Sequence, residues 1–174
     1  MQTDKALLPF GQSKTLAQYQ LNRVENWFES VHISCKNSKK FDFKASFIED
    51  LTEFDEFSPL IALYSILKRV QSSVAILSVD TPFVTEEIYK KLYKNMNGSE
   101  ALIAKSPFGS HQMCAIYSAS ILPVLKNQIL DDNHKIRNLL EKIKTKYIEF
   151  ESDEPFFNLN RPDEYKKACE RISG

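Results

Sequence analysis

The sequence is poor in glycine and cysteine. Only four of its 174 residues are glycine, and it contains no complete glycine-rich loop of the kind that cradles phosphates. The three cysteines, Cys35, Cys114 and Cys169, are far apart and odd in number. Such spacing indicates neither a zinc site nor a disulfide framework. We therefore expect a reduced, cytoplasmic protein.

The sequence also has no excess charge and no long apolar run. Lys and Arg together number 23, as do Asp and Glu, so no overall basic field would attract nucleic acid or a membrane surface. No apolar run approaches the ~18 residues that a membrane-spanning helix needs, and the N-terminus does not resemble a signal peptide. We expect one domain over residues 1–174 that binds neither nucleic acid nor membrane.

The most informative stretch runs from Val74 to Pro82. Its first six residues are aliphatic or β-branched apart from one serine, which predicts a strand buried on both faces. Pro82 cannot donate to a strand ladder, so the strand should stop at Asp80. Ligands of open α/β sheets bind beyond the carboxyl ends of the strands. Asp80 is therefore placed for a metal ion or a polar ligand, unless it caps the following helix or turn.

Strands alternate with helices along the rest of the chain, which predicts a three-layer α/β domain with a mostly parallel sheet. The spacing of apolar residues and capping signals predicts helices over 14–29 (capped by Ser13), 59–70 (capped by Ser58), 85–96, 119–130, 133–145 and from 161 onward. Strands are expected over 31–35, 45–48, 74–79, 101–104, 113–117, 147–150 and 156–159, with a polar loop over 107–112.

Four further side chains are candidates for binding chemistry. Asp50, like Asp80, ends an expected strand, and two carboxylates on one rim could hold Mg²⁺ near a nucleotide. Lys5 could neutralise a phosphate. Asn158 and Asn160 alternate on an extended segment and should face the same side. The alternatives are a solvated lysine, a helix cap or surface charge for Asp50, and a helix cap for Asn160.

Several segments, in order and over nearly the whole chain, resemble the molybdenum cofactor guanylyltransferases. They are DKALLPFG at 4–11 with KTL at 14–16, FIED at 47–50 followed by SPL at 58–60, VDTPF at 79–83, HQ at 111–112, and NLNRPDEY at 158–165. The first and the last are the most specific. Taken alone, His111 would be an exposed or satisfied loop histidine.

The resemblance implies a Rossmann-like, glycosyltransferase-A-like nucleotidyltransferase fold. It also implies transfer of GMP from GTP to the phosphate of the molybdenum–molybdopterin cofactor, with release of pyrophosphate. Implied partners are these two substrates and proteins of cofactor biosynthesis or molybdoenzyme maturation. The resemblance implies that Lys5 and Asp80 act in catalysis and that Asp80 also binds Mg²⁺. It implies that the nucleotide is bound by Lys5, Ser34, Asp50 and Asp80. The pterin substrate would be bound by Asn158 and Asn160.

The chain departs from the family pattern in two places. The family opens with a strand and a Gly-Gly-x-Ser-x-Arg loop, and Met1 stands where that loop's methionine falls. We therefore expect the first strand and most of the phosphate loop to be absent, two strands to keep unpaired edges, and transfer to be weak or nil. SPLIA at 58–62 replaces the favoured Gly-Pro-Leu-x-Gly, which leaves guanine selectivity open. The alternatives are a non-catalytic binding protein on the same fold, or a nucleotidyltransferase that uses CTP or a sugar phosphate.

Overall fold

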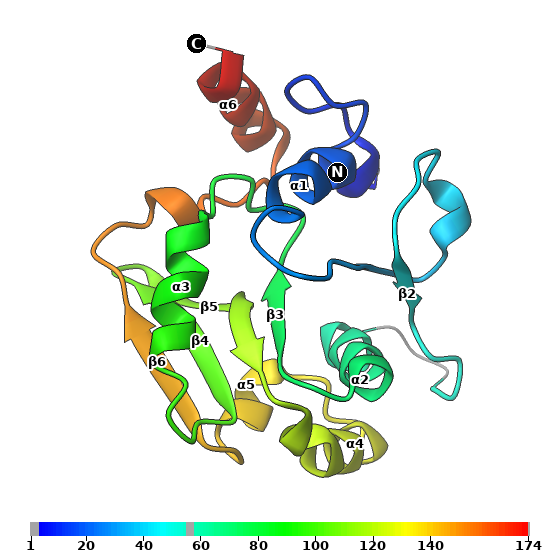
Figure 1. Ribbon diagram of the computed structural model, residues 1–174, viewed down its shortest axis with the longest axis vertical. Coiled ribbons are helices and arrows are strands. Elements are labelled where there is room, and N and C mark those ends of the chain that lie inside the picture. The colour runs from blue at the N-terminus through cyan, green and yellow to red at the C-terminus, as the bar shows by residue number, and fades with distance from the viewer. Residues whose placement is uncertain (1–3, 55–57, 174) are drawn as a thin grey trace.

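The computed structural model describes residues 4–54 and 58–173, and its helices cover both faces of a central sheet (Figure 1). The α-helices are α1 (Leu16–Val24), α2 (Pro59–Val70), α3 (Glu86–Lys94), α4 (Leu122–Leu130), α5 (Ile136–Leu140) and α6 (Pro162–Ser173). The strands are β1 (Ile33–Cys35), β2 (Phe47–Glu49), β3 (Val74–Leu77), β4 (Ala101–Ser106), β5 (Gly109–Tyr117) and β6 (Thr145–Glu149). Short 3-10 turns are η1 (Lys5–Leu7), η2 (Ser38–Lys40), η3 (Ala119–Ile121) and η4 (Glu154–Phe156).

The strands of the described residues form two sheets. The larger has the order β3-β5-β4-β6, with β5 antiparallel to both of its neighbours and β6 parallel to β4. Strands β3, β4 and β6 therefore run in one direction and β5 runs in the other. Strands β1 and β2 form a separate parallel pair. The predicted α/β class with mostly parallel strand directions is confirmed, but the strands are divided between two sheets.

Alternate residues of the larger sheet build the two cores that define the three layers. Successive side chains of a strand point to opposite faces. On one face Ile103 and Tyr117 pack against α2, α4 and α5. On the other face Leu102 and Ile116 pack against α3. Because these strands are apolar on both faces, the sheet must be covered by helices on both sides.

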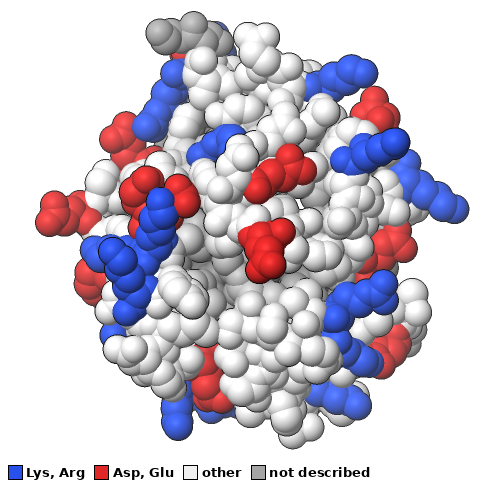
Figure 2. Space-filling view, in the orientation of Figure 1, with Lys and Arg blue, Asp and Glu red and all other residues white. Residues whose placement is uncertain are grey.

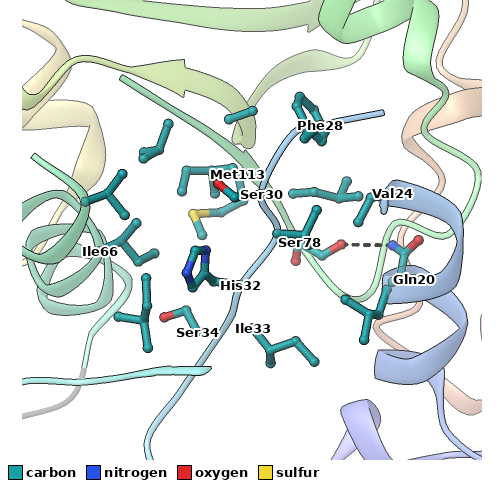
Figure 3. Close-up of a pocket in the computed structure, with 18 of the residues that line it drawn as sticks. Gln20, Val24, Phe28, Ser30, His32, Ile33, Ser34, Ile66, Ser78 and Met113 are labelled. Atoms are coloured by element: carbon teal, nitrogen blue, oxygen red, sulfur yellow. Dashed lines mark hydrogen bonds between the residues drawn. The ribbon is translucent and has the colours of Figure 1, made fainter. Parts of the chain in front are cut away.

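A cavity of about 540 Å³ separates the two sheets and is lined by α1, β1, α2 and β3 (Figure 3). Strands β1 and β3 each have one edge facing this cavity, and no strand pairing joins them within the part of the chain that is described. The cavity limits how far β3 is buried. Its side chains pack against both cores, Val74 and Ile76 on one face and Ala75 and Leu77 on the other, but only Ile76 is fully buried and the other three remain partly exposed.

The first long helix is shorter than predicted because a turn precedes it. Phe10 and Ser13 exchange two backbone hydrogen bonds of 3.2 and 3.0 Å, which hold Ser13 in the turn. Ser13 is therefore not the helix cap. That role belongs to Thr15, whose hydroxyl accepts from the Gln18 N–H at 3.1 Å. The helix ends at Val24, and the residues that follow form turns.

The predicted polar loop over 107–112 is wrong, because β5 begins at Gly109 and residues 107–108 alone form the turn of a hairpin between β4 and β5. Gly109 begins β5 with φ +147°, a backbone conformation that L side chains rarely adopt. The helix predicted over 133–145 is reduced to α5, since the hydroxyl of Thr145, the first residue of β6, donates to the Leu140 carbonyl at 2.7 Å. The strand predicted over 156–159 is absent, and η4 ends at Phe156 instead.

The cap of α2 confirms its sequence signal and provides a stability prediction. Ser58 Oγ accepts from the Ile61 N–H at 3.2 Å and lies 3.0 Å from His134 Nδ1. We expect Ser58→Ala to lower the free energy of unfolding by about 1 kcal/mol, because a helix N–H loses its acceptor. Urea denaturation measures the change. Ser58→Asp, which retains an acceptor, and Ser72→Ala at an exposed loop position should both unfold close to the unmodified midpoint.

The surface carries both signs of charge. In Figure 2, basic and acidic side chains both appear across the face that Figure 1 presents. No helix among residues 4–54 and 58–173 is long and apolar enough to cross a bilayer.

Candidate functional site

Three of the predicted site residues meet at the carboxyl end of β3. Lys5 Nζ donates to Asp80 Oδ2 at 3.1 Å and to Asn160 Oδ1 at 2.8 Å. The side chains of Lys5 and Asp80 are 26% and 16% exposed, so this ion pair is partly shielded from water. Lys5 begins η1, and Asp4 caps that turn by accepting from the Ala6 N–H at 3.0 Å. Segments far apart in the sequence thus place one cation between two oxygen-bearing side chains.

The Asp80 carboxylate is held from both sides. Ser78 Oγ donates to Asp80 Oδ1, while Lys5 occupies Oδ2. The Leu159 N–H donates to the Asp80 carbonyl at 2.9 Å, which ties the segment before Asn160 to the end of β3. The alternative role of Asp80 as a helix cap is wrong, because α3 begins at Glu86 with Thr85 in the cap position. Among the described residues, the Asp80 carboxylate accepts hydrogen bonds from side chains only, those of Lys5 and Ser78.

Asn160 and Asn158 have different surroundings. Asn160 accepts from Lys5, and α6 begins two residues later at Pro162, so Asn160 does not cap that helix. Asn158 Oδ1 is enclosed by protein and has no hydrogen-bond partner among the described residues. An unpaired buried amide oxygen is costly. It therefore marks a position where a ligand donor or a cation would be favourable.

Asp50 and Ser34 lie outside the group around Lys5. Asp50 follows β2, and its Oδ1 is buried without a hydrogen-bond partner in the part of the chain that the structure describes. Burial raises the pKa of the Asp50 carboxyl, and the charge of Lys36 only partly offsets this. Ser34 is exposed on β1 and lines the cavity. No hydrogen bond or ion pair between described residues joins either side chain to Lys5, Asp80 or Asn160.

His111 belongs to a different cluster. Its Nε2 lies 2.7 Å from Ser106 Oγ, which donates to Asp153, and its ring stacks on Phe156 with centroids 4.0 Å apart. Burial lowers the pKa of His111, although the charge of Asp153 works in the opposite direction. The interpretation of His111 as a satisfied histidine is confirmed, but it lies on β5 and not in a loop.

Sequence reasoning missed three residues that contact the end of β3. They are Ser78, Gln20 and Arg23. A signal for Gln20 was available, because it stands four residues from both Leu16 and Val24 and so shares the buried stripe of α1. A polar side chain in an apolar stripe must find buried partners. The backbone carbonyls to which it donates lie about 60 residues away, and the sequence does not indicate which residues they belong to.

The donor atoms around Asp80 suit a hard divalent cation. They are a carboxylate, the Asn160 amide oxygen, the Ser78 hydroxyl and, nearby in sequence, the unpartnered oxygen of Asn158. Hard cations of this kind take oxygen ligands and share them with substrate phosphates. Residues 4–54 and 58–173 contain no cluster of three or more His, Cys, Asp or Glu that could hold a metal ion.

A three-layer α/β fold with a lysine–aspartate pair beyond a strand end is the arrangement of a nucleotidyltransferase. Residues 1–147 match the model of the MobA-like NTP transferase domain. The chain belongs to this family, which confirms the resemblance seen in its motifs, and nucleotidyltransferases of this kind generally use a divalent metal.

Similar proteins extend the match over most of the chain. The molybdenum cofactor guanylyltransferase of Campylobacter jejuni subsp. doylei is 38% identical over 89% of this chain and 82% of its own length. That of Helicobacter pylori strain G27 is 30% identical, over 98% and 83%. The crystal structure of the molybdopterin-guanine dinucleotide biosynthesis protein A of Archaeoglobus fulgidus has a TM-score of 0.84 at 26% identity, over 99% of this chain and 92% of that one.

The raised pKa of Asp50 leads to a prediction that couples stability and binding. An acid whose folded pKa lies above its unfolded value of 3.8 loses its proton at a higher pH in the native state than in the unfolded state. Its contribution to stability is therefore favourable below pH 3.8 and falls as the pH rises through the folded pKa. We expect Asp50→Asn to raise the melting temperature at pH 7 and to flatten this part of the pH profile.

The same substitution should weaken nucleotide binding if Asp50 accepts hydrogen bonds from the base. A lost bond to a charged acceptor corresponds to about tenfold or more in the Kd for GTP. Calorimetric titration with GTP measures this loss, and thermal scans from pH 3 to 8 measure the stability. Asp131→Asn, at an exposed position after α4, should change neither quantity. An Asp50→Asn protein with unaltered GTP affinity would rule out the binding role.

Proposed function

We propose that this chain transfers GMP from GTP to the molybdenum cofactor, forming molybdopterin guanine dinucleotide and pyrophosphate. The observation that carries the proposal is the contact of Lys5 with Asp80 and Asn160. It occurs in a chain that is 38% identical to a molybdenum cofactor guanylyltransferase. The contact supplies one cation and several oxygen ligands, which are the groups that a triphosphate needs.

The reaction is an in-line displacement at phosphorus. An oxygen of the cofactor's terminal phosphate forms a bond to the α-phosphorus of GTP, and the bond from that phosphorus to the α,β-bridging oxygen breaks. The electron pair leaves with pyrophosphate. No covalent protein intermediate is required, so catalysis consists of positioning and charge neutralisation. Lys5 performs the second task by moving its ammonium group from Asp80 to the phosphate oxygens.

The remaining side chains have binding roles in this proposal. Asp80 and the neighbouring amide oxygens hold Mg²⁺, which when bound neutralises charge on the triphosphate. Ser34 and Asp50 contact the nucleoside part of GTP, and Asp50 is suited to this because its buried oxygen has no hydrogen-bond partner within residues 4–54 and 58–173. Asn158 and Asn160 contact the pterin substrate. Cys35, Cys114 and Cys169 form no disulfide with one another, which supports a location in the reducing cytoplasm.

The direct test incubates the purified chain with GTP, Mg²⁺ and molybdenum cofactor and quantifies dinucleotide and pyrophosphate. Formation of both in equal amounts, stopped by EDTA, is the expected result. A parallel series with CTP separates the alternatives. Equal transfer from CTP would indicate a nucleotidyltransferase without guanine preference, and GTP binding without any transfer would indicate a binding protein on the same fold.

A further inference from the structure

Helix α1 sends a buried glutamine into the loop that carries Asp80. Gln20 is only 6% exposed. Its Nε2 lies 3.3 Å from the Ser78 carbonyl, 3.4 Å from that of Val79 and 3.2 Å from that of Thr81. Figure 3 shows the first of these contacts as a dashed line from α1 to the end of β3. One amide group therefore contacts the backbone on both sides of Asp80.

The next turn of the same helix adds an arginine. Arg23 Nη1 donates to the Pro82 carbonyl and, at 2.7 Å, to Gln20 Oε1, while Nη2 donates to the Val84 carbonyl at 2.5 Å. The guanidinium carbon lies 5.5 and 5.2 Å from the ring centroids of Tyr19 and Trp27. Burial lowers the pKa of Arg23, but a guanidinium remains charged in a protein. The rings of Tyr19 and Trp27 thus hold the charged, planar guanidinium group of Arg23 against the loop.

These two side chains donate hydrogen bonds along most of the loop backbone. Buried carbonyls need donors, and within residues 78–84 the loop's own donors reach only the carbonyls of Ser78, from the Thr81 N–H and hydroxyl, and of Thr81, from the Val84 N–H. Gln20 and Arg23 together donate to the carbonyls of five of these seven residues. They are Ser78, Val79, Thr81, Pro82 and Val84. The carbonyl of Asp80 itself is taken by the Leu159 N–H at 2.9 Å.

We propose that Gln20 and Arg23 are positioning residues that fix the direction of the Asp80 carboxylate before metal and nucleotide bind. A carboxylate on a loop of free conformation would have to be ordered on binding, at a cost in conformational entropy. The α1 side chains remove that cost, because they hold the backbone on both sides of Asp80 against a rigid helix. This inference rests on the proposed metal role of Asp80.

The test distinguishes the effect of the hydrogen bonds that Gln20 and Arg23 donate from the effect of the Arg23 charge and from a general loss of stability. Gln20→Leu keeps the approximate size of the side chain and removes its donors. Arg23→Lys keeps the charge but cannot donate to two carbonyls in a planar fork. Ile129→Val removes one methyl group from α4, in the core on the other side of the sheet, and serves as the control for a general loss of stability. Far-UV circular dichroism and melting curves show which variants are folded.

Two measurements report on the loop without using catalysis. Hydrogen exchange of a peptide over residues 76–86 is measured in metal-free protein, and Mn²⁺ affinity is measured by titration without nucleotide. We expect Gln20→Leu and Arg23→Lys to weaken Mn²⁺ binding about 10- to 100-fold, as loss of outer-shell support does. Exchange of the Thr81 and Val84 amides should be about tenfold faster, as expected when loop opening becomes easier by that factor. Ile129→Val should leave both values unchanged.

The outcomes distinguish this inference from the function on which it rests. If the unmodified chain binds Mn²⁺ and both α1 variants bind it equally well, the positioning role is overturned while the metal role of Asp80 stands. If the unmodified chain binds no Mn²⁺, the metal role fails and the positioning role fails with it. If Ile129→Val weakens Mn²⁺ binding as much as the α1 variants do, the effect is one of stability and the inference is also overturned.

Discussion

Replacing Asp80 with asparagine is expected to lower the rate of guanylyl transfer by about 10³-fold, the upper range for removing one group that stabilises developing charge. The carboxylate lies beyond β3 with Ser78 on one oxygen and Lys5 on the other. Asparagine keeps the shape and the acceptor but loses the charge that a divalent cation needs. Initial rates of dinucleotide formation, followed across a magnesium titration, measure the change.

The metal titration also shows which step is lost. If Asp80 acts through the cation, the midpoint of activation should move to higher magnesium concentration, and Mn²⁺ binding should weaken in the absence of nucleotide. Asp153→Asn provides a matched control, because Asp153 also follows a strand of the larger sheet but accepts from Ser106 and the Phe108 N–H instead. Undiminished transfer by Asp80→Asn at every magnesium concentration would refute the proposed site.

Replacing Lys5 with methionine is expected to lower kcat/KM for GTP by about 10²-fold, because one cation would be lost from the phosphates in the transition state. Its present contacts with Asp80 and Asn160 show that the ammonium group reaches the rim. Lys5→Arg retains the charge and should keep part of the activity. Steady-state kinetics with GTP varied at saturating Mg²⁺ gives kcat and KM separately.

A second effect of the Lys5 substitution distinguishes its two roles. Without its ammonium group, Asp80 has no positive partner among the described residues, so a divalent cation meets less competition there. We therefore expect Lys5→Met to bind Mn²⁺ at least as tightly as the unmodified chain while it binds GTP more weakly. Lys14→Met, outside this group of contacts, should change neither. Equal GTP affinity in Lys5→Met and the unmodified chain would contradict the phosphate role.

Helix and strand boundaries were predicted well where interactions between neighbouring residues determine them. Ser58 and Pro59 mark the start of α2 because a cap and a fixed φ act within one turn. Pro82 and the apolar run before it placed the end of β3 near Asp80, and the strand ends at Leu77. Prediction failed at Ser13, where a pair of backbone bonds to Phe10 outweighed a capping signal.

Long-range contacts set the limits of prediction at the site. Motif order and residue type selected Lys5, Asp80 and Asn160 as candidates, but these residues are separated by 75 and 155 positions in the contacts that join them. No periodicity connects such distant positions. The same limit applies to Gln20, whose polar character in a buried stripe was visible although its acceptors were not.

The sequence by itself determined the α/β class, the family, and the chemical types available for binding a metal and a triphosphate. Those properties follow from hydrophobic period, capping and motif order, which act over a few residues at a time. Only the tertiary structure decided that Lys5 contacts Asp80, that the buried Asp50 oxygen has no hydrogen-bond partner among the described residues, and that α1 holds the Asp80 loop. These contacts join residues that are far apart in the sequence, and the packing of the layers determines which of those residues meet.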